Sequence, residues 1–319
     1  MTVRCASALL GAALWALAAA APAFPDRPVR VVVGFAPGGS DIGLRIIAPK
    51  LSERWGEPVI VDNRPGAAGN LGAELVAKAA PDGHTVLLCV NSYTINTTVY
   101  RNLTWDLLRD FAPVGRYSLS PLAVVVSDRV PAKTMVELIA FARANPGKLN
   151  YGSAGAGTAP HLAAELFAMQ AGVQMVHVPY KGSAPSVTAL IAKEVDLSFG
   201  ALSAFDAVIK DGRARALAVT TAKRSSQLPD LPTVSESGVP GFDVDIWYGL
   251  IVPAKTPAAA IKKISDDLGR VMADPDTQSK LRSRGLEPAY LDPAQTGELM
   301  RRDVARWREV TNRIQLSLD

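Results

Sequence analysis

Residues 149–167 read LNYGSAGAGTAPHLAAELF, which predicts an apolar strand, a glycine-rich turn and the start of a helix. The turn lacks Cβ atoms at three positions, namely Gly152, Gly155 and Gly157. We expect the helix to begin near Thr158 and Pro160, and its first acidic residue is Glu165. Such a helix start presents bare backbone N–H groups and the positive end of the helix dipole to an anion. The stretch alone leaves open a second interpretation, a tight turn that binds nothing.

Three motifs with a similar outline do not fit this stretch. A dinucleotide fingerprint needs a further glycine where Pro160 stands, and a P-loop needs Gly-Lys-Ser/Thr, which is absent. A nucleophile elbow needs a glycine two residues before Ser153, where the chain has Tyr151. The mismatches argue against a nucleotide-binding loop and against an activated serine.

The first 23 residues have the pattern of a secretory signal peptide. Arg4 is their only charged residue, the run 6–21 is apolar, and residues 21–23 offer small side chains for cleavage. The run is too short and too rich in alanine for a membrane span. We therefore expect an exported, soluble protein cleaved near Ala23. Cys89 is then its only cysteine, so we expect no internal disulfide.

The charge pattern argues against a nucleic-acid partner. The formal net charge is only +4, and basic residues are interspersed with acidic ones, as in RRDVARWRE at 301–309. Aromatic residues make up 6% of the chain, which leaves few stacking partners for bases. We expect these charges to be solvated on helix surfaces.

Short β-rich runs alternate with longer helical patterns, which is typical of an α/β fold with mostly parallel sheets. The alternation breaks at 114–127, where two β-like runs flank Ser120-Pro121, and again at 242–252, a second extended run. Two sheet units joined by two extended crossings predict two domains with a cleft between them. The expected helices are 42–55, 71–79, 135–144, 163–169, 187–191, 258–272, 277–284 and 295–314.

A second glycine-rich loop, VVVGFAPGGSDIGLR at 31–45, also follows a predicted strand. Its Pro37-Gly38-Gly39 segment allows a ligand to approach the backbone, and Ser40 or Asp41 can cap the next helix. In open parallel sheets, ligands lie beyond the carboxyl ends of the strands. Two such loops facing each other across a cleft predict a small-molecule site.

Six stretches, spread in order over almost the whole exported chain, carry a family resemblance. They are FPDRPVRVVVGFAPGGSD (24–41), VDNRPGAAGNLGAELVAKAAPDGHTVLL (61–88), LNYGSAGAGTAPHLAAELF (149–167), VPYKGSAPSVTALIAKEVDLSF (178–199), RARALAVTTAKRSSQLPDLPTVSESGVPGF (213–242) and WYGLIVPAKTP (247–257). Together they resemble the Bug family, the periplasmic solute-binding proteins of tripartite tricarboxylate transporters.

The resemblance implies a type II periplasmic-binding-protein fold whose two α/β domains close on a small carboxylate. It implies a monomer in the periplasm that delivers this ligand to one large and one small integral membrane subunit. The implied divisions are a signal peptide at 1–23, a first domain at 24–121 plus 252–319, and a second domain at 122–251.

The resemblance also implies ligand-binding residues on both domains. In the first domain they are Phe35, Pro37, Gly38, Gly39, Ser40 and Asp41, with Ser92 and Asn96 from a polar loop after the third strand. In the second domain they are Ser153, Ala154, Gly157, Thr158, Ala159, His161, Tyr180 and Gly200. Gly200 stands where many relatives have an acidic residue, which predicts a ligand without an ammonium group.

We expect neither catalysis nor a bound metal or cofactor, because His84 and His161 have no neighbouring cysteine or acid that suggests a triad or metal set. For Asp41, a helix cap is a better interpretation than a contact with an anion, because two negative charges repel. Two functions other than transport stay open at this stage. One is a ligand sensor that docks on a signalling receptor, and the other is a secreted hydrolase that uses Ser153 and His161.

Overall fold

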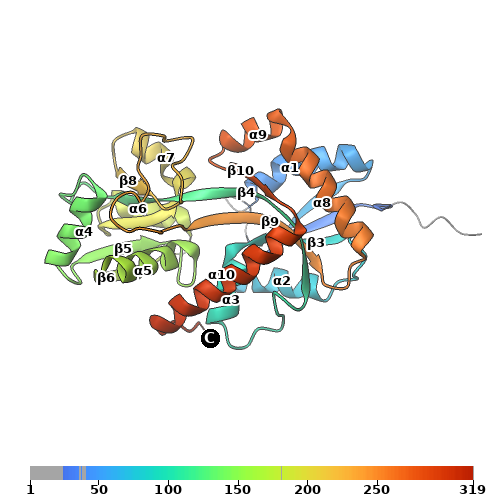
Figure 1. The fold of residues 1–319 in the computed structure, drawn as a ribbon, viewed down its shortest axis with the longest axis horizontal. Coiled ribbons are helices and arrows are strands. Elements are labelled where there is room, and N and C mark those ends of the chain that lie inside the picture. The colour runs from blue at the N-terminus through green and yellow to red at the C-terminus, as the bar shows by residue number, and fades with distance from the viewer. Residues whose placement is uncertain (1–23, 36, 38–40, 181, 319) are drawn as a thin grey trace, which may run out of the picture.

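The computed structural model describes residues 24–35, 37, 41–180 and 182–318. Within them, the chain forms two lobes side by side, each built from a sheet and its helices (Figure 1). The α/β architecture predicted from the sequence is confirmed. The predicted signal peptide, 1–23, lies outside the described residues.

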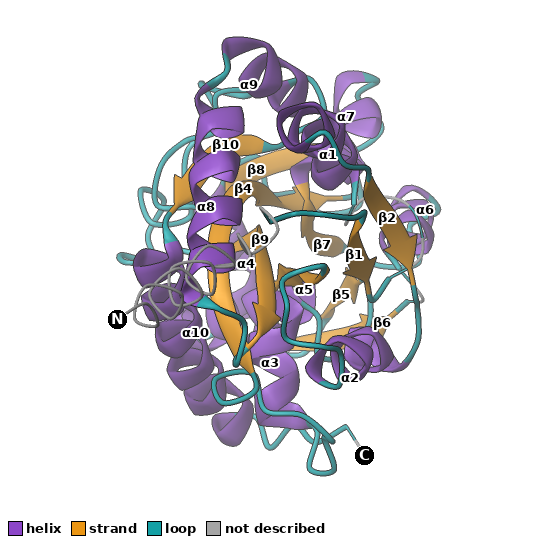
Figure 2. Ribbon diagram, turned by 90° about the vertical axis from the view of Figure 1, so that its right-hand side faces the viewer, coloured by secondary structure: helices purple, strands orange, loops and turns teal. Residues whose placement is uncertain are grey.

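The first lobe has a parallel core of Val-rich strands in the order β2-β1-β3, which β9 and then β4 continue in antiparallel fashion. Both faces of β1 are covered, because helices pack on either side of the sheet (Figure 2). The strands are β1 (Val29–Val33), β2 (Val59–Asn63), β3 (Thr85–Val90), β9 (Asp245–Pro253), β10 (Glu287–Leu291) and the first part of β4 (Phe111–Val126). The helices are α1 (Ile42–Trp55), the 3₁₀ turn η1 (Ala67–Gly69), α2 (Asn70–Ala77), α8 (Ala258–Ala273) and α9 (Pro275–Arg282).

The second lobe repeats this plan with parallel strands in the order β7-β5-β6. The second part of β4 pairs antiparallel with both β7 and β8. The strands are β5 (Leu149–Ser153), β6 (Met175–Pro179), β7 (Leu197–Ala201) and β8 (Arg215–Val219). The helices are α4 (Met135–Ala144), α5 (Ala159–Ala171), α6 (Ser183–Ile191) and α7 (Leu202–Lys210).

The two β-like runs expected around Ser120-Pro121 are one continuous strand, β4. Pro121 is the last residue of β4 that pairs with β9 in the first sheet, and Leu122 is the first that pairs with β7 in the second. Proline cannot donate to a strand ladder, so it suits the point where pairing changes sheets. The return crossing lies beside it, because Asp245 pairs with Pro121 while the Val244 N–H donates to Thr220 O of the second lobe. All of β9 therefore pairs within the first sheet.

Two helices join the lobes in addition to these crossings. Helix α3 (Asn91–Val99) has Tyr93 in the first core and Ile95 in the second, although the sequence predicted a polar loop here. Helix α10 (Pro293–Arg313) has Val304 in the first core and Trp307 in the second. In Figure 1, α10 runs along one side of the molecule from lobe to lobe.

Candidate functional site

A cleft of about 1520 Å³ lies between the lobes and is lined by residues from both. The first lobe contributes Phe35, the start of α3, parts of β9 and the 282–286 turn after α9. The second lobe contributes the β5–α5 turn and the starts of α6 and α7. The lining thus lies beyond the carboxyl ends of the parallel strands, where α/β proteins bind ligands.

Besides α1, whose first residue Ile42 also lines the cleft, four helices begin at it, each after a parallel strand: α3, α5, α6 and α7. None of the four has an acidic residue in its first turn, and none has a side-chain hydrogen bond that caps its N-terminus. Their unpaired N–H groups and positive dipole ends therefore act together on the cleft. The first-turn residues that line it are Asn91, Ser92, Ala159, Pro160, Ser183, Ala184, Ser203 and Ala204.

The β5–α5 turn has two backbone N–H groups that are left unpaired at residues lining the cleft. Ala156 and Ala159 line it, and their N–H groups make no hydrogen bond within the described residues. The Gly157 N–H, in contrast, donates to Nδ1 of His161 over 3.0 Å. Gly157 has φ +74°, a left-handed conformation that glycine adopts without strain. One of the N–H groups expected to hold a ligand is thus used inside the protein.

Beneath this turn lies a cluster of nearly parallel aromatic rings from three elements. His161 on α5 stacks on His177 of β6 with ring centroids 3.9 Å apart, and Tyr151 of β5 lies 4.9 Å from the His177 ring and 6.4 Å from the His161 ring. His177 Nε2 lies 2.7 Å from Ser153 Oγ, and the Tyr151 hydroxyl donates to Glu165. Burial, with a smaller effect of His177, lowers the pKa of His161 from 6.5 to about 3. Burial alone lowers the pKa of His177 to about 4, so both rings are neutral at pH 7.

Charged side chains around the cleft are mostly cationic. Among the described lining residues they are Lys210, Arg282, Arg284 and one acid, Asp206. Asp206 and Lys210 form an ion pair at 2.8 Å along α7. The two arginines, on the first lobe, are not balanced by a carboxylate in this lining. The cleft therefore favours an anion through both its backbone and its side chains.

Seven of the expected ligand-binding residues line the cleft. They are Phe35, Ser92, Asn96, Ala154, Gly157, Thr158 and Ala159. Ser92 and Asn96 do so from helix α3 rather than from a loop. Gly38, Gly39 and Ser40 lie outside the described residues, and Pro37 is exposed but is not among those that line the cleft.

The other expected residues are placed beside the cleft rather than in its wall. Asp41 is the N-cap residue of α1, as expected, but its side chain does not cap the helix: the buried carboxylate accepts hydrogen bonds from the Arg45 and Asn63 side chains instead. Gly200 lies in β7, and a Cβ there would be 2.3 Å from the Phe205 ring, so the position has no room for a side chain. Its neighbour Ala201 lines the cleft instead.

Tyr180, Ser153 and His161 also lie outside the wall of the cleft. The Tyr180 hydroxyl donates to Glu194 at 3.4 Å. Ser153 is fully buried, and its Oγ faces His177, not His161. A buried serine whose Oγ also bonds the Gly155 backbone is not presented to a substrate, which argues against the hydrolase hypothesis.

Several residues that line the cleft were not predicted from the sequence. Asn91 donates through Nδ2 to Asp245 O at 2.7 Å and has a buried Oδ1 without a partner among the described residues. Ser203 lies in the first turn of α7, a helix whose apolar residues Leu202, Phe205 and Val208 recur at helical spacing and could have revealed it. No local pattern distinguishes Arg284, because its position at the cleft depends on the fold.

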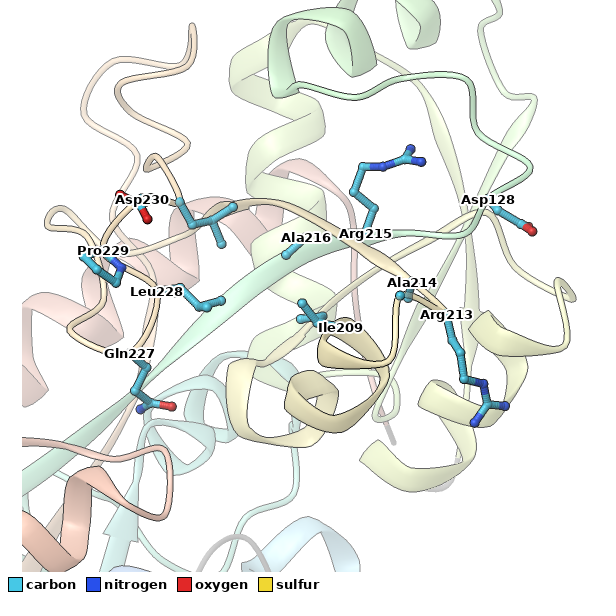
Figure 3. Close-up of a pocket in the computed structure, with 12 residues that line it drawn as sticks. Asp128, Ile209, Arg213, Ala214, Arg215, Ala216, Gln227, Leu228, Pro229 and Asp230 are labelled. Atoms are coloured by element: carbon cyan, nitrogen blue, oxygen red, sulfur yellow. The ribbon is translucent and has the colours of Figure 1, made fainter.

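A second hollow, of about 650 Å³, lies on the second lobe around α7, β8 and residues 227–231 (Figure 3). Its two arginines, Arg213 and Arg215, point away from each other, and Asp128 and Asp230 lie at opposite ends. Its polar groups therefore do not converge on a ligand, and none of the expected site residues lines it.

Two features are absent from the part of the chain that the structure describes. No helix in this part of the chain is long and apolar enough to cross a membrane. No group of three or more His, Cys, Asp or Glu side chains in it is arranged to hold a metal ion.

The chain matches known proteins over most of its length. The family described as "Tripartite tricarboxylate transporter family receptor" matches residues 44–316. The "UPF0065 protein in tcbD-tcbE intergenic region" of Pseudomonas sp. (strain P51) is 39% identical over 290 residues, 90% of this chain and 86% of that protein. The solved structure "R. palustris Rpa4515 with adipate" is 35% identical with TM-score 0.83, covering 92% of this chain and 99% of that one. "Structure of periplasmic binding protein BugD" is 33% identical with TM-score 0.78, covering 92% and 99%.

Proposed function

This chain belongs to the tripartite tricarboxylate transporter receptor family, and on that premise we propose that it captures a small carboxylate in its cleft and delivers it to a membrane transporter. The family consists of substrate-binding receptors rather than enzymes, and the chain has the two-domain fold of periplasmic binding proteins. The resemblance to Bug proteins found in the sequence is thereby confirmed.

One observation carries the choice of ligand class: four uncapped helix N-termini without first-turn acids meet at one cleft. Carboxylates bind well at such ends because the N–H groups and the dipole both favour negative charge. Arg282 and Arg284 add positive charge from the first lobe. The relative with adipate supports a ligand that carries two carboxylates.

The arrangement of the lobes supports capture by closure. The β4 and β9 crossings run side by side at Pro121 and Asp245, so a small rotation there opens or closes the cleft. We place the two points where the chain crosses between the lobes near residues 121 and 244, whereas the resemblance implied a return to the first domain after residue 251. Helix α10 is shared between the lobes. Closure would shield the unpaired N–H groups of Ala156 and Ala159 from water, which strengthens their hydrogen bonds to a carboxylate.

The test uses mature protein, from Phe24 onward, shown by native mass spectrometry to be free of ligand. Thermal unfolding is followed with mono-, di- and tricarboxylates, and with amines and neutral amides of matched length as controls. We expect a rise in Tm with a carboxylate only, because a ligand that binds the folded state alone stabilises it by about 2.7 kcal/mol at a hundredfold excess over Kd. No shift and no mass adduct with any carboxylate would contradict the proposal.

Delivery to the transporter, export to the periplasm and a monomeric state are parts of the same proposal. We expect deletion of the gene to abolish uptake of the identified carboxylate by intact cells, and the exported protein to restore it. A signalling receptor as the partner would instead leave uptake intact and abolish a response to the ligand. Fractionation of cells gives the location, and light scattering of the purified protein gives the oligomeric state.

A further inference from the structure

We propose that His161 is a positioning residue of the ligand site: its neutral ring accepts the Gly157 N–H and so fixes the turn that presents the Ala156 and Ala159 N–H groups. This inference rests on the proposed function, since it concerns how the same cleft holds an anion. It also changes the expected role of His161, from a contact with the ligand to a support beneath the turn.

The hydrogen bond between the Gly157 N–H and the His161 ring defines the tautomer of that ring. Nδ1 lies 3.0 Å from the Gly157 nitrogen and is the acceptor, so it carries no proton and the neutral ring holds its proton on Nε2. The Nε2 atom faces Glu165, 3.9 Å from Oε1. His161 is only 4% exposed and does not line the cleft, so the ring cannot meet a ligand directly in this arrangement.

A second histidine supports the other end of the turn. His177 Nε2 lies 2.7 Å from Ser153 Oγ, and that Oγ accepts the Gly155 N–H at 3.1 Å. The two imidazole rings stack at 3.9 Å, so a shift of one ring displaces the other. Together they tie the Gly155 and Gly157 N–H groups inward, while the N–H groups of Ala156 and Ala159, two residues that line the cleft, have no partner among the described residues.

The surroundings keep His161 neutral. The titratable groups that face it are Glu165 on its own helix, His177 on β6 and Tyr151 on β5. Among the described residues, the other elements packed against α5, namely β7, α3 and α10, place no charged side chain in hydrogen-bond or ion-pair contact with it. Protonation would put an N–H donor on Nδ1 against the Gly157 donor, so it would break the support.

The experiment compares His161→Gln, which keeps an acceptor that cannot titrate, with His161→Leu, which removes the acceptor. His84→Gln serves as a matched control, because it removes a histidine that does not line the cleft or join the stack. Affinities for a carboxylate that binds the wild type are measured by calorimetry at pH 7.5. We expect His161→Gln to stay within about threefold of wild type and His161→Leu to lose about tenfold or more, the cost of an unpaired buried donor.

Two further measurements distinguish His161 as a support of the turn from His161 as a purely structural residue and from His161 as a ligand contact. We expect ¹⁵N NMR to show the Nε2–H tautomer of His161 with and without ligand. We also expect the affinity to be flat between pH 8 and about 5.5, because the ring stays neutral there. A cationic histidine that bound the ligand would instead strengthen binding as the pH falls through its usual pKa.

The results distinguish a failure of the role proposed for His161 from a failure of the proposed function. Wild-type affinity in a folded His161→Leu protein, or affinity that rises as the pH falls and does so only while His161 is present, would overturn the role of His161 and leave the proposed function intact. If wild type binds no carboxylate at all, the proposed function fails first, and the inference falls with it. If His161→Leu does not fold, the tautomer and the pH profile of His161→Gln and wild type still decide.

Discussion

Glu287 on the first lobe accepts a 2.7 Å hydrogen bond from the hydroxyl of Ser226 on the second lobe. The same carboxylate oxygen also accepts from the Ser226 N–H at 3.1 Å and from Ser225 Oγ at 3.3 Å. Close by, Gly285 approaches Ser203 so tightly that a Cβ on Gly285 would lie 2.4 Å from Ser203 Cβ. The 282–287 segment is therefore where the first lobe touches the second beside the cleft.

We expect Glu287→Ala to favour the open arrangement, because it removes three hydrogen bonds between the lobes, each worth about 1 kcal/mol or less when partly exposed. The radius of gyration from X-ray scattering of the ligand-free protein should rise, and ligand affinity should fall about three- to tenfold. Glu298→Ala is the control, because Glu298 pairs with Arg301 within α10 and, among the described residues, makes no hydrogen bond or ion pair with the second lobe. An unchanged scattering curve with unchanged affinity would show that these bonds do not set the opening.

Ala156→Asp should weaken carboxylate binding by about tenfold or more, because the new charge would lie at the α5 N-terminus and repel the ligand. Ala156→Asn is the matched control, with the same shape and no charge, and should bind within a few fold of wild type. Ala156 is exposed and free of positive-φ strain, whereas a Cβ at Gly157 would lie 2.6 Å from Leu318. Equal affinities of the two Ala156 variants by calorimetry would place the anion elsewhere.

The charges at the cleft predict a preference for ligands without an ammonium group. Asp206 is the one acid among the described lining residues, and Lys210 neutralises it at 2.8 Å. An ammonium group enclosed without a partner costs several kcal/mol, so succinate should bind more tightly than aspartate, and glutarate more tightly than glutamate. Lys210→Gln should shift the affinity ratios of succinate to aspartate and of glutarate to glutamate toward the amino acid, because it frees the Asp206 carboxylate. Tighter binding of an amino acid by wild type would contradict this expectation.

Acid should destabilise the folded protein through the two stacked histidines. Their folded pKa values, about 3 for His161 and about 4 for His177, lie below the usual 6.5. The unfolded chain therefore binds protons that the folded chain does not. The contribution to stability is complete above pH 6.5 and is lost as the pH falls toward the folded values, at up to about 1.4 kcal/mol per pH unit for each ring. The free energies of unfolding of wild type and His161→Gln, measured in urea, should approach each other as the pH falls from 7 to 4.5. If the two free energies instead kept a constant difference over this range, the pKa of His161 would be the same in the folded and unfolded protein.

Local sequence was sufficient for much of the fold. Helix α1 was predicted at 42–55 and observed at Ile42–Trp55, because its apolar residues recur at helical spacing and Gly56 ends it in a left-handed conformation. Helix α3 was missed, because NSYTINTTV is rich in β-branched residues and asparagine, which favour strands and turns. Packing of Tyr93 and Ile95 into the two cores overrides that preference.

The sequence by itself determined the two-lobed α/β plan, the glycine-rich β5–α5 turn without first-turn acids, and the family. These features depend on local spacing and on motifs that can be read in order along the chain. Only the tertiary structure decided that four helix N-termini meet at one cleft, that His161 supports the turn instead of lining the site, and that Arg284 faces the same cleft. Such relationships depend on which strand lies next to which, and on which of several available partners a donor finds. Contacts between distant segments set both, and no local pattern in the chain encodes them.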